Sequence, residues 1–167
     1  MELDEYKKLI TGRLSRFYEI CESGTYLAEE YDIVAEKNLE ETTAFGENIA
    51  TKEIFLVSFD CDEDFIEQQI ERIPEIVLSG WRSISKNKST ILTRVFVMRN
   101  VPFALIQKLR SWTFEKSEQK QFKSYAGAGI IIVDENNFTL FASPAAAKNC
   151  QLLRVVNNPV ETAEDEI

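Results

Sequence analysis

Residues 52–59 read KEIFLVSF, a stretch that is apolar on both faces toward its end, as in a central strand of a sheet. The acidic run Asp60–Asp64 follows at once, and negative charge favours a helix N-terminus because the helix dipole is positive there. Apolar residues at helical spacing run from Phe65 to Val77, and Thr90–Met98 (TILTRVFVM) has the pattern of another buried strand. This segment therefore predicts a strand–helix–strand unit with parallel strands at the centre of the fold.

Toward the N-terminus, apolar residues that recur every three or four positions predict a helix over residues 3–22. A loose alternation over residues 30–37 predicts a half-buried strand, and residues 42–49 carry a weaker strand signal. In the helix that follows the central strand, Pro74 is expected to cause a kink or a division.

Toward the C-terminus, Asn100 and Pro102 predict a helix start, with the asparagine as cap and the proline in the first turn. The apolar face of this helix extends to Trp112, which is therefore expected in the core. The remaining elements are a break in the pattern, a hairpin of two strands and a short helix: residues 116–126, 127–133 with 138–142, and a segment that starts at Ser143-Pro144.

These elements predict a single α/β domain over residues 1–156, with a mixed sheet of about five strands, helices packed on it and a C-terminal β-hairpin. An α+β arrangement is the alternative. Residues 157–167 are polar and acidic, and we expect them to form a disordered tail. A length of 167 residues is enough for one domain with its own hydrophobic core.

The composition excludes several classes of chemistry. Histidine is absent, which removes imidazole bases, Ser-His-Asp and Cys-His arrangements and the usual zinc sites. Cys21, Cys61 and Cys150 show no CxxC spacing and no secretory signal precedes them, so we expect reduced thiols in a cytoplasmic protein. No apolar run approaches the roughly 18 residues of a membrane span, and no motif implies a cofactor or a bound metal.

The charge of the chain is divided by position. The net charge of −9 comes from −13 over residues 1–81, +8 over residues 82–128 and −4 over residues 129–167. In the middle segment, ten Lys or Arg residues are offset only by Glu115 and Glu118. This division predicts either a positive surface for an anionic partner or two halves that neutralise each other.

The densest part of the positive segment also carries aromatic residues. Cations bind phosphates and carboxylates, and exposed rings stack on unpaired bases, so this mixture suits a nucleic acid or an acidic protein. We therefore predict a non-catalytic interaction domain that contacts an anionic partner through residues 108–125. The candidate binding residues are Lys108, Arg110, Lys116, Lys120, Lys123 and Tyr125.

Two alternatives to that prediction concern the same positive segment. Charged runs are commonly a solvated face, or they pair with acidic residues of the same chain. A structural role is the other alternative: a subunit of a homo- or hetero-oligomer in which the basic stretch docks on an acidic surface. Such an assembly would loosen as the salt concentration rises.

A metal-dependent nuclease is a further hypothesis. The order of elements in the first 98 residues is also the core order of the PD-(D/E)xK nucleases, which hold a divalent metal on adjoining strands. Asp32 is the candidate aspartate, and Glu19 or Glu22 could approach it from the first helix. The decisive tripeptide is missing, since Lys52-Glu53 is reversed and Glu118-Gln119-Lys120 follows the wrong helix.

An acidic cluster marks the expected carboxyl end of a parallel strand, where open α/β sheets bind ligands and carboxylates can hold Mg²⁺. Its members are Asp60, Asp62, Glu63 and Asp64. Helix-start chemistry accounts for the same residues without a ligand. Cys61 lies among these acids and is expected to have a raised pKa. Gly127-Ala128-Gly129 precedes a strand, so we expect a close backbone approach there and no phosphate loop.

The second half of the chain contains four short stretches that can be compared with known sequences: Ser89–Thr93, Val101-Pro102, Phe114–Ser117 and Ile130–Asp134. Together they resemble a pattern in small uncharacterised prokaryotic, largely archaeal, proteins. The resemblance implies a free-standing cytosolic domain and no mechanism. This chain has Ser124-Tyr125-Ala126-Gly127 where the pattern has a Gly-Trp pair.

Overall fold

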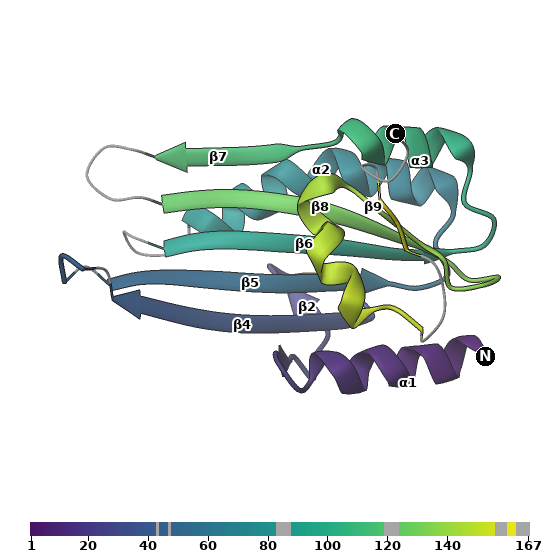
Figure 1. Cartoon of the computed structure of the whole chain (residues 1–167), viewed down its shortest axis with the longest axis horizontal. Coiled ribbons are helices and arrows are strands. Elements are labelled where there is room, and N and C mark those ends of the chain that lie inside the picture. Colours follow the sequence, from purple (N-terminus) through teal and green to yellow (C-terminus); the bar gives the residue numbers. More distant parts are fainter. Residues whose placement is uncertain (43, 47, 83–87, 119–123, 156–159, 163–167) are drawn as a thin grey trace.

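The computed structural model describes residues 1–42, 44–46, 48–82, 88–118, 124–155 and 160–162. Within them the chain forms a mixed eight-stranded sheet, a separate two-stranded sheet, and helices on both faces of the larger sheet (Figure 1). The predicted α/β class with a mixed sheet is confirmed, although the sheet has more strands than the sequence pattern predicts.

The described part of the chain contains three α-helices and one 3₁₀ helix: α1 (Leu3–Leu14), α2 (Glu63–Arg82), α3 (Phe103–Ser111) and η1 (Pro144–Leu152). The larger sheet consists of β1 (Glu19–Ile20), β4 (Ile33–Thr42), β5 (Asn48–Ser58), β6 (Lys88–Met98), β7 (Phe114–Glu118), β8 (Ser124–Asp134), β9 (Leu140–Ala142) and β10 (Val160–Thr162). The small sheet consists of β2 (Thr25–Tyr26) and β3 (Glu29–Glu30). No helix among the described residues is long and apolar enough to cross a membrane.

β5, β6 and β8 run parallel at the centre of the sheet, as the strand–helix–strand pattern predicts. Leu56 of β5 lies beside Arg94 of β6, which lies beside Ile130 of β8. β4 joins β5 on the other side in an antiparallel hairpin, and the main path of the sheet is β1-β4-β5-β6-β8-β9-β10. The central strands are covered on both faces, which explains their nearly continuous apolar sequences.

β8 has two different partners along its outer edge. β7 pairs antiparallel with its first half and β9 pairs antiparallel with its second half, so that Ile131 lies beside Ala142. The second pairing confirms the predicted hairpin. The sequence pattern predicts no strand at β7, because the sequence FEKSE has a single apolar residue and its strand form depends on pairing with β8.

Two hydrophobic layers lie on opposite faces of the sheet. α2 and α3 cover one face, where Ile70 and Leu105 belong to the same buried cluster as Phe96 of β6. α1 and η1 cover the other face, where Ile10 and Cys150 are buried with Val95. Figure 1 shows α2 and α3 behind the sheet and η1 in front of it.

The N-terminal helix is shorter than the apolar spacing predicts. α1 ends at Leu14, and residues 19–20 form β1, which pairs with β4. Tyr18 leaves the helical path and packs its ring edge-on against Phe55, with 5.1 Å between the centroids. The prediction of a helix to residue 22 is therefore wrong, because pairing and burial after the turn override the local periodicity.

The strand boundaries around the first hairpin also differ from the predicted ones. The strand predicted at 30–37 is β4, which continues to Thr42, and the strand predicted at 52–59 is β5, which begins at Asn48. Between them, Ala44–Gly46 form a turn in which the Phe45 side chain is 94% exposed. The weak strand signal at 42–49 is thus divided between two strand ends and a turn.

The predicted division of the helix at Pro74 and the predicted cap at Asn100 are both wrong. Pro74 lies inside a continuous α2, so the helix is not divided. α3 begins at Phe103 with Pro102 as its cap residue, whereas Asn100 has a left-handed φ of 54°. Asparagine tolerates this conformation better than most residues, and here it turns the chain from β6 toward α3.

The C-terminal region contributes one more strand. β10 pairs in parallel with β9, so Val160–Thr162 belong to the sheet although the composition predicts a disordered tail there. The other residues of the predicted tail, 157–159 and 163–167, lie outside the described residues.

Gly129 permits the close backbone approach that the glycines of β8 predict. A Cβ on Gly129 would lie 2.6 Å from the Cβ of Ala146 in η1, and 2.8 Å from its backbone nitrogen. η1 can therefore pack directly on this strand, which closes the second hydrophobic layer.

Candidate functional site

The predicted binding residues are spread over several elements. Lys108 and Arg110 are half-buried on α3, and Lys116 is exposed on β7. The guanidinium carbon of Arg110 lies 5.9 Å from the ring centroid of Phe103. Lys120 and Lys123 lie outside the described residues. The structure therefore locates the predicted cations of α3 and β7, but not those of the following segment.

Tyr125 lies on the other face of the sheet from Lys116. Lys116 pairs with Ala126, and neighbouring residues of a strand point to opposite faces. The Tyr125 hydroxyl donates to a carboxylate oxygen of Glu115 at 3.1 Å, and its side chain covers Gly127. Burial and the neighbouring carboxylate raise the pKa of Tyr125. The structure thus does not bring this tyrosine together with the basic residues.

Lys116 and Phe114 project toward the side of the sheet that α2 and α3 cover. Their partners in β8, Ala126 and Ala128, belong to the hydrophobic layer under those helices, and paired residues share a face. Phe114 packs against this layer while half-buried, as does Trp112 after α3. The prediction that Trp112 lies in the core is therefore only partly right, since some of its apolar surface remains open beside the cations.

One flank of α2 is occupied by the small sheet. Arg72 and Ile76 line a cavity of about 240 Å³ together with Tyr26 and Glu29. Arg72 forms an ion pair with Glu29, and this interaction lowers the pKa of that glutamate. Tyr26 is also close to Lys52 of β5, at 5.8 Å from ring centroid to amine, so this flank faces the β5 side of the sheet.

The opposite flank of α2 faces β8 and β7. Successive helical residues are rotated by about 100°, which places Glu67, Glu71 and Leu78 on the side away from Arg72 and Ile76. β5 and β8 lie on either side of β6, so a flank that turns away from β5 turns toward β8. Glu67 and Glu71 are exposed, and Leu78 packs half-buried against the same layer as Phe114.

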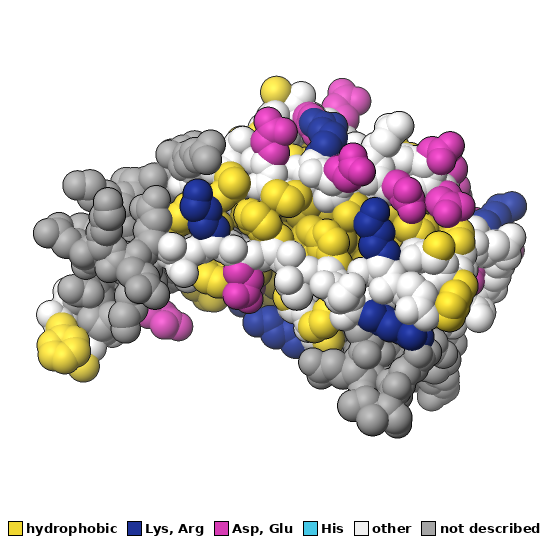
Figure 2. Space-filling view, turned by 90° about the horizontal axis from the view of Figure 1, so that it is seen from above, with side chains coloured by type: hydrophobic (Ala, Val, Ile, Leu, Met, Phe, Trp, Pro, Cys, Tyr) yellow, Lys and Arg dark blue, Asp and Glu magenta, His cyan; other side chains and the backbone are white. Residues whose placement is uncertain are grey.

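These side chains together form a surface that we name the α2–β7 face. It has an apolar centre and an acidic margin, and it carries the exposed cation Lys116: the apolar residues are Leu78, Trp112 and Phe114, and the acids are Glu67 and Glu71. Lys108 and Arg110 lie two residues apart on α3, so they point to different flanks of that helix. Figure 2 looks down on the edge that β7 and α3 form, and it shows a band of hydrophobic side chains with acidic side chains along its upper margin. The face therefore combines open apolar surface with charges of both signs.

Arg94, another cation of the positive segment, is buried in the core. It is 1% exposed on β6, and its guanidinium donates to the carbonyl oxygens of Leu56 at 3.1 Å and Val95 at 3.2 Å. The guanidinium carbon of Arg94 lies 4.9 Å from the ring centroid of Tyr31 and 4.3 Å from that of Phe96.

The Arg94 charge has no bonded carboxylate among the described residues. Its NH2 group donates to Ser58 Oγ at 2.9 Å and to Gln69 Oε1 at 3.4 Å, and its Nε has no partner. Burial lowers the pKa of Arg94 to about 10, since desolvation disfavours the charged form. This arginine therefore holds neighbouring strands and α2 together, and it takes no part in an exposed patch.

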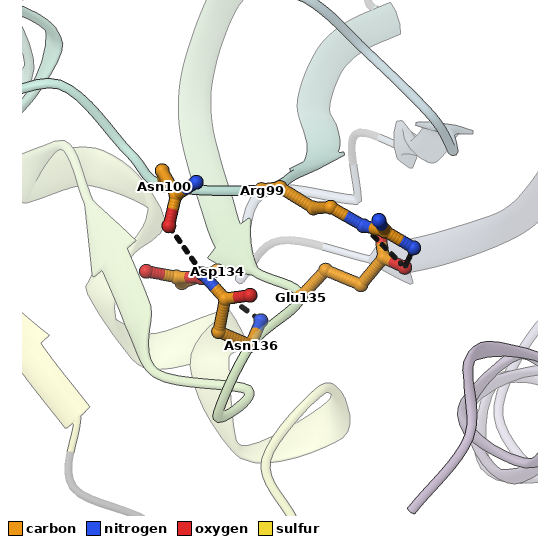
Figure 3. A network of polar contacts seen from close by, with 5 residues as sticks. All are labelled: Arg99, Asn100, Asp134, Glu135 and Asn136. Atoms are coloured by element: carbon orange, nitrogen blue, oxygen red, sulfur yellow. Dashed lines mark hydrogen bonds and ion pairs between the residues drawn. The ribbon is translucent and has the colours of Figure 1, made fainter.

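The carboxyl ends of β5, β6 and β8 border an open cleft of about 420 Å³. Its lining includes the predicted acids Asp60, Asp62 and Glu63, together with Arg99 and Glu135. Figure 3 shows how the loops here are joined. Arg99 forms an ion pair with Glu135 at 3.3 Å, and the side-chain amide of Asn136 donates to Asn100 Oδ1 at 2.6 Å.

Most polar groups at this edge are engaged in holding the loops. Asp62 Oδ1 accepts the Phe65 amide at 2.7 Å, which caps the start of α2 as the helix-start interpretation predicts. Asp134 Oδ1 accepts a hydrogen bond from the backbone amide of Asn136 at 2.9 Å. Burial is the main cause that raises the pKa of Cys61 to about 11, so the predicted direction is right although the nearby acids contribute less. The edge is therefore built as a structural junction.

The candidate aspartate of the nuclease hypothesis also has a structural contact. Asp32 Oδ2 accepts the Phe59 amide at 2.7 Å, where β4 begins and β5 ends. Glu19 lies on β1 beside Glu36, so it does not approach from a helix as that hypothesis expects. Among the residues that the structure describes, no three Cys, Asp or Glu side chains are grouped closely enough to hold a metal ion.

The acidic margin of the α2–β7 face was not predicted as part of any site. Glu67 and Glu71 lie four residues apart, which places both on the flank of α2 away from Arg72, whereas Glu75 lines the cavity beside Arg72. This four-residue spacing was the signal that could have grouped the two acids from the sequence.

Comparisons with known proteins give no further assignment. No family model, no curated protein and no solved structure matches this chain.

Proposed function

We propose that this chain is an interaction domain that binds an acidic protein surface through the α2–β7 face. The observation that carries the proposal is that Lys116 is exposed on the same face of β7 as the half-buried Phe114, two residues away along the strand. Aromatic side chains and arginine are enriched at the centre of protein interfaces, and a charged residue such as Lys116 contributes mainly to specificity and association rate.

The apolar centre of the face supplies the area that such a contact needs. Trp112 and Phe114 are half-buried, so each keeps apolar surface in contact with water that a partner can cover. Removing apolar surface from water stabilises a complex by roughly 25 cal/mol per Å². The cations then select the partner by charge and orient it, because charge complementarity acts mainly on specificity and association rate.

The charge distribution favours an acidic protein over a nucleic acid. A nucleic acid carries a continuous row of phosphates, and binding it requires a groove or surface that is positive along its length. Glu67 and Glu71 border the same face, and the chain as a whole has a net charge of −9. A short group of carboxylates on a protein can contact Lys116 without also lying against Glu67 and Glu71.

Fluorescence anisotropy with two labelled probes tests the proposal: a deca-glutamate peptide and a single-stranded oligothymidylate. We expect the peptide to bind at low salt and to dissociate as the ionic strength rises to about 0.15 M, where the Debye length is about 8 Å. Lys116→Glu should abolish this binding. The matched control is Lys148→Glu, the same change at an exposed position on η1, and it should leave binding unchanged.

Two results would overturn the proposal. One is the absence of peptide binding at low salt, or binding that Lys116→Glu does not weaken. The other is tighter binding of the oligothymidylate than of the peptide, since that would identify a nucleic acid as the preferred anionic partner.

A further inference from the structure

We propose that the open edge of β7 is a docking site for residues 163–167 of the same chain, which continue β10 as a parallel strand beside β7. This inference rests on the proposed function for the role of Lys116, because it names a segment that competes with an acidic partner there. Residues 163–167 lie outside the described residues, and their sequence is AEDEI. The described strand β10 ends at Thr162, which fixes where this segment starts.

The outer edge of β7 carries open backbone groups. The Ser143 amide donates to the carbonyl oxygen of Ile130, so the even-numbered residues of β8 turn their backbone groups toward β7 and β9. Glu115 and Ser117 pair with odd-numbered residues of β8, and their N–H and C=O groups therefore turn outward. Among the residues that the structure describes, no backbone group contacts these two from the outer side. Such an edge is a template for another strand.

β10 is directed toward this edge. β7 and β9 follow one another along β8 and run in the same direction, since both are antiparallel to it. β10 runs parallel to β9, with Thr162 level with Ala142, which in turn pairs with Ile131 of β8. A straight continuation of β10 therefore passes along the outer edge of β7 and runs parallel to it.

The pairings of β8 give the register of this continuation. Phe114 pairs with Ala128, three positions from the level at which β10 ends. Asp165 is three residues past the end of β10, so it comes level with Phe114. Ile167 comes level with Lys116 two residues later. Three strand residues span about 10 Å, so a segment of this length reaches the part of β7 that carries Lys116.

This register supplies partners for the open groups of β7. In a parallel ladder a residue bonds to the residues before and after the one that is level with it. Glu166 is level with Glu115, so the Glu115 amide donates to the carbonyl oxygen of Asp165. The Ser117 amide donates in the same way to the carbonyl oxygen of Ile167. The outward groups of β9 and β7 stay in phase along β8, so the continuation needs no bulge.

The acidic side chains of the segment divide between the two faces of the sheet. Asp165 comes to the face of β7 that carries Phe114 and Lys116, at a diagonal position from which it can reach the lysine. Glu166 comes to the opposite face, directly beside Glu115, and like charges in that position repel each other. The segment is therefore held by backbone hydrogen bonds and one contact of opposite charges, and a partner with more carboxylates can replace it.

Amide hydrogen exchange measured by NMR tests the docking on the full chain and on a variant that lacks residues 163–167. We expect the amides of Glu115 and Ser117 to exchange about tenfold faster in the variant, because each loses its acceptor. The amides of Phe114 and Lys116 bond to β8 in both proteins, so their exchange should not change. They are the internal control for the fold of the variant.

Two neighbouring substitutions test the register. Asp165→Asn removes a contact of opposite charges and should speed exchange of the Ser117 amide about twofold. Glu166→Gln removes a repulsion and should slow the same exchange about twofold. Both variants change the net charge equally, so opposite effects cannot arise from the overall charge. Effects in the same direction, or no effect of either substitution, would overturn the register.

Deca-glutamate binding connects the docked segment with the proposed function. Removing residues 163–167 should strengthen this binding about twofold or more, which is the factor expected if the segment covers the site at least half of the time. Lys116→Glu should abolish the binding in the full chain and in the shortened one. Equal affinity of the two chains for the peptide would overturn the competition.

The outcomes separate this inference from the proposed function. If the Glu115 and Ser117 amides exchange equally with and without residues 163–167, the docking is wrong, and peptide binding that depends on Lys116 leaves the interaction domain standing. Faster exchange in the variant, without peptide binding in either protein, overturns the proposed function and leaves the docking standing. Protection that persists in the variant and rises with protein concentration assigns the β7 edge to a second copy of the chain and overturns the inference.

Discussion

Arg94 and Lys116 belong to the same positively charged segment of the chain, yet the structure places them in opposite environments. Arg94 is 1% exposed between the rings of Tyr31 and Phe96, whereas Lys116 is exposed on the strand at the outer edge of β8. The difference follows from strand position. β6 lies between β5 and β8 with a helical layer on each face, whereas β7 pairs only with β8 among the residues that the structure describes.

This comparison shows why the net charge of a segment is a poor guide to the charge of a surface. A cation on a central strand must give up its hydration, and it is retained only where carbonyl oxygens, rings and polar side chains replace water. A cation on an edge strand keeps its hydration and remains available to a partner. The positive segment therefore divides into a structural cation and a small set of surface cations.

The largest expected effect on stability comes from substitution of Arg94, the buried cation of the comparison. Arg94→Ala should lower the free energy of unfolding by about 3 kcal/mol, because it leaves a cavity between two rings and removes donors from two carbonyl oxygens. Arg94→Met should cost at least about 1 kcal/mol less, because methionine fills much of the volume and needs no counter-charge. Urea denaturation of the three proteins measures both differences.

The two substitutions separate packing from charge. If Arg94→Met is as damaging as Arg94→Ala, the hydrogen bonds of the guanidinium stabilise the fold more than its burial opposes it. Arg94 would then be a favourable buried cation, and the expected advantage of Arg94→Met over Arg94→Ala would be wrong.

The same contrast explains which parts of the structure the sequence predicts. β5, β6 and β8 are recognisable because they are apolar on both faces, and the α/β class follows from the helices between them. The sequence pattern does not predict β7, because the segment FEKSE forms a strand only by pairing with β8. The helix expected to residue 22 is too long because Tyr18 keeps helical spacing while it packs against Phe55.

The candidate surface is predictable only in part, for a related reason. Lys108, Arg110 and Lys116 stand out by composition, and their local sequence is enough to select them. Which side of the sheet each one faces depends on register, and register separates Tyr125 from Lys116. Glu67 and Glu71 join the surface only through the position of α2 over β8, which no local pattern contains.

Alkaline pH should lower the free energy of unfolding by a smaller amount than Arg94→Ala does, because buried thiols and tyrosines lose their protons. Burial raises the pKa of Cys61 and of Cys150 to about 11, from about 9 in the unfolded chain. The native state then holds protons that the unfolded chain loses, so their contribution to stability is complete below pH 9 and is lost as the pH rises toward 11. Tyr26 and Tyr31, whose pKa values burial raises to about 12, continue the loss above pH 10.

Urea denaturation at half-unit steps from pH 8 to pH 11 measures this loss. Cys150→Ala removes one of the titrating thiols, so the decline of the unfolding free energy with pH should be shallower by at most about 1 kcal/mol between pH 9 and pH 10. A variant that declines as steeply as the wild type would show that the Cys150 thiol does not titrate differently in the two states.

The smallest expected effect on stability comes from substitution of Lys116, the exposed cation of the comparison. This measurement decides whether Lys116 stabilises its own chain or is available to bind a partner. Lys116→Ala should change the free energy of unfolding by less than about 0.5 kcal/mol, as most surface substitutions do. The same substitution should weaken deca-glutamate binding, whereas Lys148→Ala should change neither property. A loss of stability of 1 kcal/mol or more would instead mean that Lys116 pairs within its own chain, and the division between a structural Arg94 and an available Lys116 would fail. Stability and binding must therefore be measured on the same variant, because only a change in binding without a change in stability assigns the lysine to an interface.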